Sequence, residues 1–201
     1  MIKKIILYSL FSLFIFSSIY FFLNKDYYQN TTVQKIENQE ALPGGHFKLI
    51  KQDGSVFDSE ISNKLMLIYF GFTYCPDVCP TTLIKMADVI DSLGDDALKV
   101  NSIFISVDPE RDNVEVINDY VSAFHNQIIG LTGNEEQISN VAKDWGVYYQ
   151  KEFIDGSAEY TVNLLDIIFL ANANGEFIDF FPPKIQSALI VEKVRNLIKS
   201  D

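Results

Sequence analysis

Residues 65–94 read LMLIYFGFTYCPDVCPTTLIKMADVIDSLG, and the change of pattern within them sets the architecture. Residues 65–71 form a continuous apolar run of strand length, which is typical of a central strand covered on both faces. In residues 80–93 the apolar side chains recur at helical spacing. Cys75 and Cys79 are therefore predicted to occupy a strand-to-helix junction.

Strand and helix patterns alternate on either side of this junction. An Asp-Gly turn separates two short strands, residues 47–50 and 56–57, which predicts an opening hairpin. Downstream, the periodicity predicts a strand at 100–107, a helix at 113–124, a strand at 128–131, a helix at 135–145, a hairpin of 164–171 with 176–181, and a helix at 185–198. The expected fold class is α/β, with a central mixed sheet flanked by helices and sites at the carboxyl ends of strands.

An uncharged apolar segment precedes this domain. Residues 5–23 contain no charge, and their length of 19 residues approaches the roughly 20 that cross a bilayer as a helix. Lys3 and Lys4 come before it and favour a cytoplasmic N-terminus. A cleavable signal peptide is the alternative, but residues 17–25 lack a small-x-small cleavage pattern. An uncleaved transmembrane helix is the favoured interpretation.

The chain is thus expected to have three parts. Residues 1–23 are the cytoplasmic tip and membrane anchor, residues 24–42 a polar tether, and residues 43–201 a single extracytoplasmic domain. The 16 Lys and Arg residues less Lys3 and Lys4 leave 14, against 27 Asp and Glu, so the exported part has a formal charge of −13. Such acidity excludes nucleic acid as a plausible partner and otherwise favours solubility.

Cys75 and Cys79 are the two cysteines of the chain, and their spacing places both on one face of a helical turn. Three outcomes stay open: a disulfide, a dithiol that exchanges with other disulfides, or two thiolates that bind Cu(I). A helix N-terminus favours the thiolate form. A disulfide that only braced so short a loop would gain little. Zinc is disfavoured because its structural sites gather four ligands, and only His46 and His125 could complete one.

The run FGFTYCPDVCPTTL, residues 70–83, closely resembles the signature of the Sco/SenC family, the copper-handling proteins of cytochrome c oxidase assembly. Further similarity, in the family's order, lies in ISVDPERD (105–112), GLTG (130–133) and NGEF (174–177). The resemblance implies a thioredoxin-like fold with Cys75 and Cys79 as copper ligands. It also implies that the chain delivers copper to the copper-centre subunit of the oxidase or reduces that subunit's cysteines.

One position departs from the family. Members carry a distal histidine, the third copper ligand, in a Tyr-x-Val-Asp-His-Ser stretch, whereas residues 160–166 here read YTVNLLD. Leu164 therefore stands where the ligand is expected, and an alkyl side chain cannot coordinate a metal. Asn163 and Asp166 offer only harder oxygens, which suit Cu(I) poorly. We expect Cu(I) binding to persist and Cu(II) binding to weaken.

Three functions are compatible with these residues. The leading one is a metallochaperone for Cu(I), which is not a conventional enzyme. The second is a thiol-disulfide oxidoreductase that needs only the two cysteines, and the third is a docking module without metal chemistry. The expected location is the inner or plasma membrane, in a single pass, with the C-terminal domain in the periplasm or another extracytoplasmic space.

Overall fold

The computed structural model of the chain describes residues 42–153 and 159–200. The expected membrane anchor, and the tether up to residue 41, lie outside the described residues. Within the described residues, no helix is both long and apolar enough to cross a bilayer.

The strands, in chain order, are β1 (Lys48–Lys51), β2 (Val56–Asp58), β3 (Leu65–Gly71), β4 (Val100–Ser106), β5 (Ile128–Thr132), β6 (Tyr149–Phe153), β7 (Tyr160–Leu164), β8 (Ile168–Ala171) and β9 (Phe177–Phe181). The helices are α2 (Val78–Leu93), the 3-10 helix η1 (Gly94–Lys99), α3 (Val114–Ser122), α4 (Glu135–Asp144) and α5 (Ser187–Ser200).

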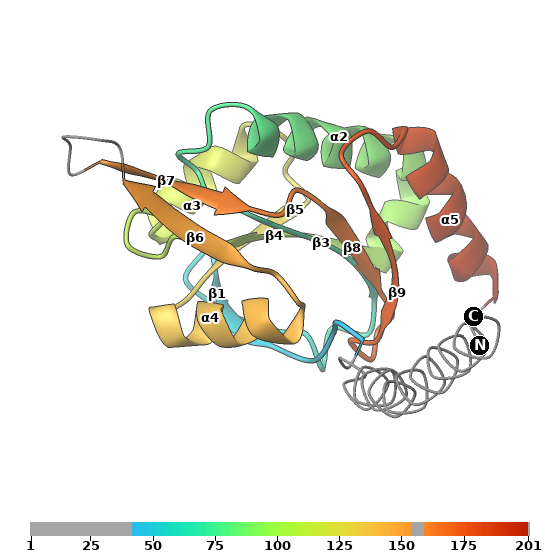
Figure 1. Cartoon of the computed structure of the whole chain (residues 1–201). Helices are drawn as coiled ribbons and strands as arrows, with labels where there is room; N and C mark the ends of the chain where they lie inside the picture. Colours follow the sequence, from blue (N-terminus) through green and yellow to red (C-terminus); the bar gives the residue numbers. More distant parts are fainter. Residues whose placement is uncertain (1–41, 154–158, 201) are drawn as a thin grey trace, which may run out of the picture. The chain divides into compact units, whose positions relative to one another are not determined.

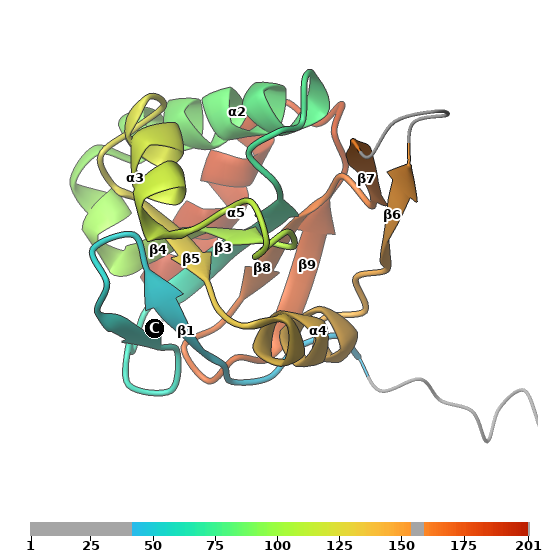
Figure 2. The same ribbon diagram turned by 90° about the vertical axis from the view of Figure 1, so that its left-hand side faces the viewer.

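The main sheet has seven strands in the order β2-β1-β5-β4-β3-β8-β9. Its centre is parallel, because β4 pairs in parallel with both β3 and β5, whereas β1 and β8 join it antiparallel. Helix α2 lies above the sheet and α4 below it in both views (Figures 1 and 2). The prediction of a mixed sheet with helices on both faces is confirmed.

The two central strands are buried along their whole length. Every residue of β3 and β4 is buried, as the unbroken apolar run at residues 65–71 predicts for a strand covered on both faces. Phe70 packs edge-on against Phe169 of β8, with 6.0 Å between ring centroids, and Trp145 meets the same ring at 5.6 Å. These side chains hold the strand that leads into the cysteines in a rigid core.

The register of β3 and β4 places two loops together. Leu65 pairs with Val100 and Gly71 with Ser106, so both strands end at the same level of the sheet. The cysteine loop follows β3, and the loop containing residues 107–113 follows β4. Because the strands are parallel, these loops leave the same edge of the sheet side by side.

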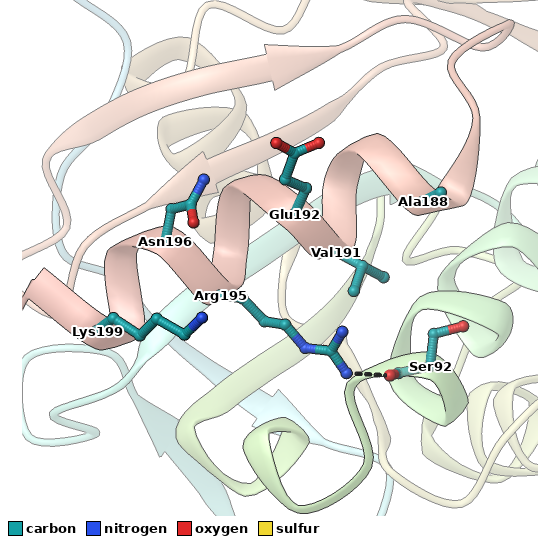
Figure 3. Close-up of a pocket in the computed structure, with 7 residues that line it drawn as sticks. All are labelled: Ser92, Ala188, Val191, Glu192, Arg195, Asn196 and Lys199. Atoms are coloured by element: carbon teal, nitrogen blue, oxygen red, sulfur yellow. Dashed lines mark hydrogen bonds between the residues drawn. The ribbon is translucent and has the colours of Figure 1, made fainter.

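The helix after the cysteines is fastened to the C-terminal helix. Arg195 of α5 donates a hydrogen bond from Nη2 to the carbonyl oxygen of Ser92, at 2.7 Å, near the end of α2 (Figure 3). A cation suits this position, since the last carbonyls of a helix have no partner within it. The contact anchors the end of α2 that lies farthest from Cys79.

A second hairpin was not predicted. Strands β6 and β7 form a separate two-stranded sheet, with Tyr149 paired to Leu164 and Phe153 to Tyr160. The sequence YQKEF of β6 is polar and exposed on most positions, so it carries no apolar pattern that indicates a strand. Leu164 was expected to begin the strand that pairs with residues 176–181, but it ends β7, and β8 begins at Ile168.

Candidate metal centre

Cys75 and Cys79 meet where the loop after β3 turns into α2. The helix begins at Val78, two residues earlier than predicted, so Cys79 lies in its first turn and Cys75 in the preceding loop. The backbone N–H of Cys79 donates to the Cys75 sulfur at 3.4 Å. Both cysteines are free thiols. The prediction that the two sulfurs can meet agrees with this contact, although Cys75 lies before the helical turn and not within it.

The two thiols differ in their surroundings. Cys75 keeps 8% of its surface exposed, whereas Cys79 is 0% exposed. Burial raises the pKa of the Cys79 thiol to about 12, although the neighbouring Tyr69 hydroxyl acts in the opposite direction. The expectation that the helix N-terminus favours the thiolate is therefore wrong for Cys79, because loss of hydration disfavours its charged form more strongly.

A groove of about 280 Å³ opens beside Cys75, between the cysteine loop and β7. It is lined by Phe72, Cys75, Pro76, Asp77, Val78, Thr161, Val162, Asn163 and Leu164. Successive side chains of a strand point to opposite faces, so a groove that touches four consecutive residues follows the edge of β7. Leu164, half-buried, thus shares a groove with Cys75.

The donor atoms fit a soft, low-coordinate metal. Two sulfurs lie together, and among residues 42–153 and 159–200 no three His, Cys, Asp or Glu residues are grouped as a metal site. His125, in the loop after α3, faces Asp91 with 3.3 Å between Nε2 and the carboxylate oxygen, and His46 is exposed. Paired thiolates without a nitrogen or oxygen donor suit Cu(I) better than Cu(II) or zinc.

Asp77, between the cysteines, is the exposed N-cap residue of α2, and its side chain makes no capping hydrogen bond within the described part of the chain. Asp166 instead fastens the helix to the segment after Leu164. Its carboxylate accepts a hydrogen bond from Thr82 Oγ1 at 2.9 Å. The segment that carries the leucine is therefore tied to the helix that carries Cys79.

Asp112 holds the start of the cysteine loop. Its carboxylate accepts hydrogen bonds from the backbone N–H of Thr73 at 2.9 Å, from Thr73 Oγ1 at 2.6 Å and from Ser106 Oγ at 2.5 Å. The residue is 0% exposed. Burial raises the pKa of Asp112, while the hydrogen bonds from Ser106 and Thr73 oppose that shift. The motif at residues 105–112 was noted in the sequence, but this role was not predicted.

Arg111 joins three segments around the same loop. Its Nε donates to the Asp108 carboxylate, and its Nη1 donates to the carbonyl oxygen of Tyr160 in β7 at 2.8 Å. The guanidinium carbon lies 3.7 Å from the Tyr160 ring centroid and 4.7 Å from that of Tyr74. Stacking of this kind fixes the hairpin and the cysteine loop against the loop after β4. No chemistry had been assigned to Arg111 from the sequence.

Known proteins resemble this chain in sequence. A profile of the SCO1/SenC family matches residues 35–199. A SCO2-like protein of Rickettsia felis is 41% identical over 140 residues, which span 69% of this chain and 68% of that protein.

Solved structures resemble this chain in fold as well. A crystal structure of Arabidopsis thaliana ScoI with copper bound is 37% identical, covers 79% of this chain and 99% of its own, and superposes with a TM-score of 0.72. The fold is shared more widely, with BsSco, described as a member of the Sco family of cytochrome c oxidase assembly proteins, at 20% identity and a TM-score of 0.58 over 79% of this chain and 97% of its own. The chain, with its thioredoxin-like fold, belongs to the SCO1/SenC family.

Proposed function

We propose that this chain is a membrane-tethered carrier of Cu(I), which it holds on Cys75 and Cys79 and presents to the copper-centre subunit of cytochrome c oxidase. The observation that carries the proposal is the donor set. Two sulfurs lie together at the junction of β3 and α2, and Leu164 faces the same groove where the family has a histidine. Copper is the cargo, and the two thiolates are its ligands.

The surface around the groove supports a protein as the recipient. Val78 of the groove is 44% exposed, and Tyr74 and Leu165, which adjoin the groove residues Cys75 and Leu164 in the chain, are 64% and 52% exposed, so apolar side chains are exposed close to a thiol that is itself nearly covered. Apolar side chains grouped at a functional site are typical of docking surfaces. A docked partner can take the metal directly, without its release into water.

Residues 1–23 are proposed as the anchor that keeps this exchange at the membrane, and residues 24–42 as the tether. The folded domain is proposed to lie in the periplasm or an equivalent extracytoplasmic space. This topology follows from the uncharged apolar segment and from Lys3 and Lys4 before it.

A Cu(I) titration tests the proposal. The reduced full-length chain, in detergent, competes with a Cu(I) chelator beside a Cys75→Ser/Cys79→Ser variant and a Leu164→His variant. We expect one Cu(I) per parent chain, loss of binding in the double variant, and added Cu(II) binding in Leu164→His. A parent that competes no better than the double-serine variant would refute copper carriage.

A second function, thiol-disulfide exchange, is favoured by the unequal exposure of the cysteines. Cys75 lines the groove, and Cys79, whose backbone N–H contacts the Cys75 sulfur, is fully buried. The Cys75 thiolate attacks a partner disulfide, one partner sulfur leaves as a thiolate, and Cys79 then displaces the second. The partner is reduced by two electrons and this chain is oxidised to its disulfide. A mixed disulfide that accumulates with Cys79→Ser but not with Cys75→Ser supports this reaction, and its absence in both rejects it.

A further inference from the structure

A buried tyrosine hydroxyl that forms no well-aligned hydrogen bond lies within reach of the Cys79 thiol and the Asp166 carboxylate. Tyr69 belongs to β3 and is 0% exposed, and its hydroxyl has no hydrogen-bond partner in the described part of the chain. A buried hydroxyl that forms no hydrogen bond is costly, and phenylalanine would fill the same space without that cost. The hydroxyl therefore calls for a stronger acceptor than the free Cys79 thiol.

Gly71 shows how closely this ring approaches the sulfur. A methyl group added at Gly71 would lie 3.2 Å from Tyr69 Cε1 and 3.3 Å from the Cys79 sulfur, so the ring edge and the sulfur converge over the glycine. The same methyl group would collide with Phe104 at 2.6 Å, so only glycine leaves room for this approach. Tyr69 and Cys79 thus both lie against Gly71, with the Phe104 ring beside them.

The Cys79 sulfur becomes a stronger hydrogen-bond acceptor when it binds a metal as a thiolate. A thiol sulfur is a weak acceptor, whereas a thiolate carries negative charge and accepts a stronger hydrogen bond. A tyrosine hydroxyl keeps its proton at neutral pH, so Tyr69 remains a hydrogen-bond donor. The Tyr69 hydroxyl, which forms no well-aligned hydrogen bond while Cys79 is a thiol, gains a strong acceptor when Cys79 is a metal-bound thiolate.

We propose that Tyr69 is a positioning residue for copper: its hydroxyl donates a hydrogen bond to the Cys79 sulfur in the Cu(I)-bound form. The inference rests on the proposed function, since it requires Cu(I) to bind Cys79. Tyr69 itself does not touch the metal. The hydrogen bond holds the buried sulfur in one orientation and disperses part of its charge, which strengthens binding at a site that has lost its third ligand.

Asp166 is the competing acceptor for this hydroxyl. Its carboxylate also lies near Tyr69 and helps to raise the pKa of that residue, but it already accepts the hydrogen bond from Thr82. A hydroxyl that turned to Asp166 in the loaded protein would contribute nothing to the copper–sulfur bond. The experiment must therefore distinguish these two acceptors.

The test compares Tyr69→Phe with Tyr120→Phe in the full-length chain in detergent. Tyr120 of α3 is the matched control, because its hydroxyl is also buried without a partner and its ring packs on Phe104 at 5.6 Å. Cu(I) affinity is measured by competition with a chelator, and thermal unfolding of each metal-free variant checks the fold. We expect Tyr69→Phe to weaken Cu(I) binding about tenfold or more, and Tyr120→Phe to change it by less than about twofold.

A second measurement reports on the hydroxyl itself. In protein labelled with ¹³Cζ-tyrosine, the Tyr69 resonance should move when Cu(I) is added, and the Tyr120 resonance should move much less. The Tyr69 shift should persist in an Asp166→Asn variant, because the sulfur is the acceptor. A merely structural role for Tyr69 would leave its resonance unchanged by copper.

The outcomes separate the two proposals. Equal Cu(I) affinities of parent and Tyr69→Phe overturn the role of Tyr69 while leaving the cysteine site intact. A copper-induced resonance shift that disappears in Asp166→Asn assigns the hydroxyl to the carboxylate and also overturns it. A parent chain that binds no Cu(I) refutes the proposed function, and the role of Tyr69 falls with it.

Discussion

Replacing Asp112 by asparagine should loosen the loop that carries the cysteines. The carboxylate accepts three hydrogen bonds, two from Thr73 and one from Ser106, at 2.5 to 2.9 Å. An amide of the same shape turns an NH2 group toward at least one of these donors. One or two hydrogen bonds to a charged group are lost, each worth about 1.5 to 3 kcal/mol.

Part of this loss is offset, because the asparagine no longer buries a charge. The raised pKa of Asp112 shows that burial disfavours its ionised form despite the hydrogen bonds. We therefore expect the free energy of unfolding to fall by about 2 to 4 kcal/mol in Asp112→Asn. For a domain of this size that corresponds to a decrease in Tm of roughly 5 to 12 °C.

Urea unfolding followed by tryptophan fluorescence measures the change, since Trp145 is buried in the core. Asp119→Asn is the matched control, because Asp119 is an exposed acid on α3, and it should change stability by less than about 0.5 kcal/mol. Cu(I) affinity should fall in Asp112→Asn as the loop loses its fixed conformation. Equal stabilities of the two variants would refute the assignment of Asp112 as the residue that holds the loop.

Two further predictions follow from the same site. Because the pKa of Cys79 is raised from 9.0 to about 12 in the folded chain, its contribution to stability is fully present below pH 9 and is lost as the pH rises toward 12. Between pH 9 and 12, the free energy of unfolding of the reduced, metal-free protein should decline more steeply than that of Cys79→Ala. If the two curves of unfolding free energy against pH run parallel, the Cys79 thiol does not have a raised pKa in the folded chain. Arg111→Lys removes the stacking on Tyr160 and one of two hydrogen bonds, so amide exchange in β7 should accelerate about tenfold, while exchange in β4 stays unchanged. Equal exchange rates in parent and variant would show that Arg111 does not hold the hairpin.

The main features of the fold were predictable because they depend on local pattern. The unbroken apolar run at residues 65–71 indicated a central strand, and the helical spacing after it indicated α2. The spacing of Cys75 and Cys79 indicated that the two residues come together, whereas the assignment of Leu164 to a ligand position came from the family resemblance and stays a prediction. Each of these conclusions needs only a few consecutive residues, whose periodicity or chemistry is visible without knowledge of distant contacts.

Other features depend on contacts between distant segments. The polar strand β6 pairs with β7 although its own residues carry no strand signal, and Asp112 meets Thr73 across 39 positions because β3 and β4 run in parallel with matched ends. Cys79 lies at a helix N-terminus, where sequence reasoning expects a stabilised thiolate, yet its thiol has a raised pKa. The residues of a chain determine which local structures form, but the burial of a sulfur or a carboxylate is a property of everything packed around it, and only the tertiary structure decides it.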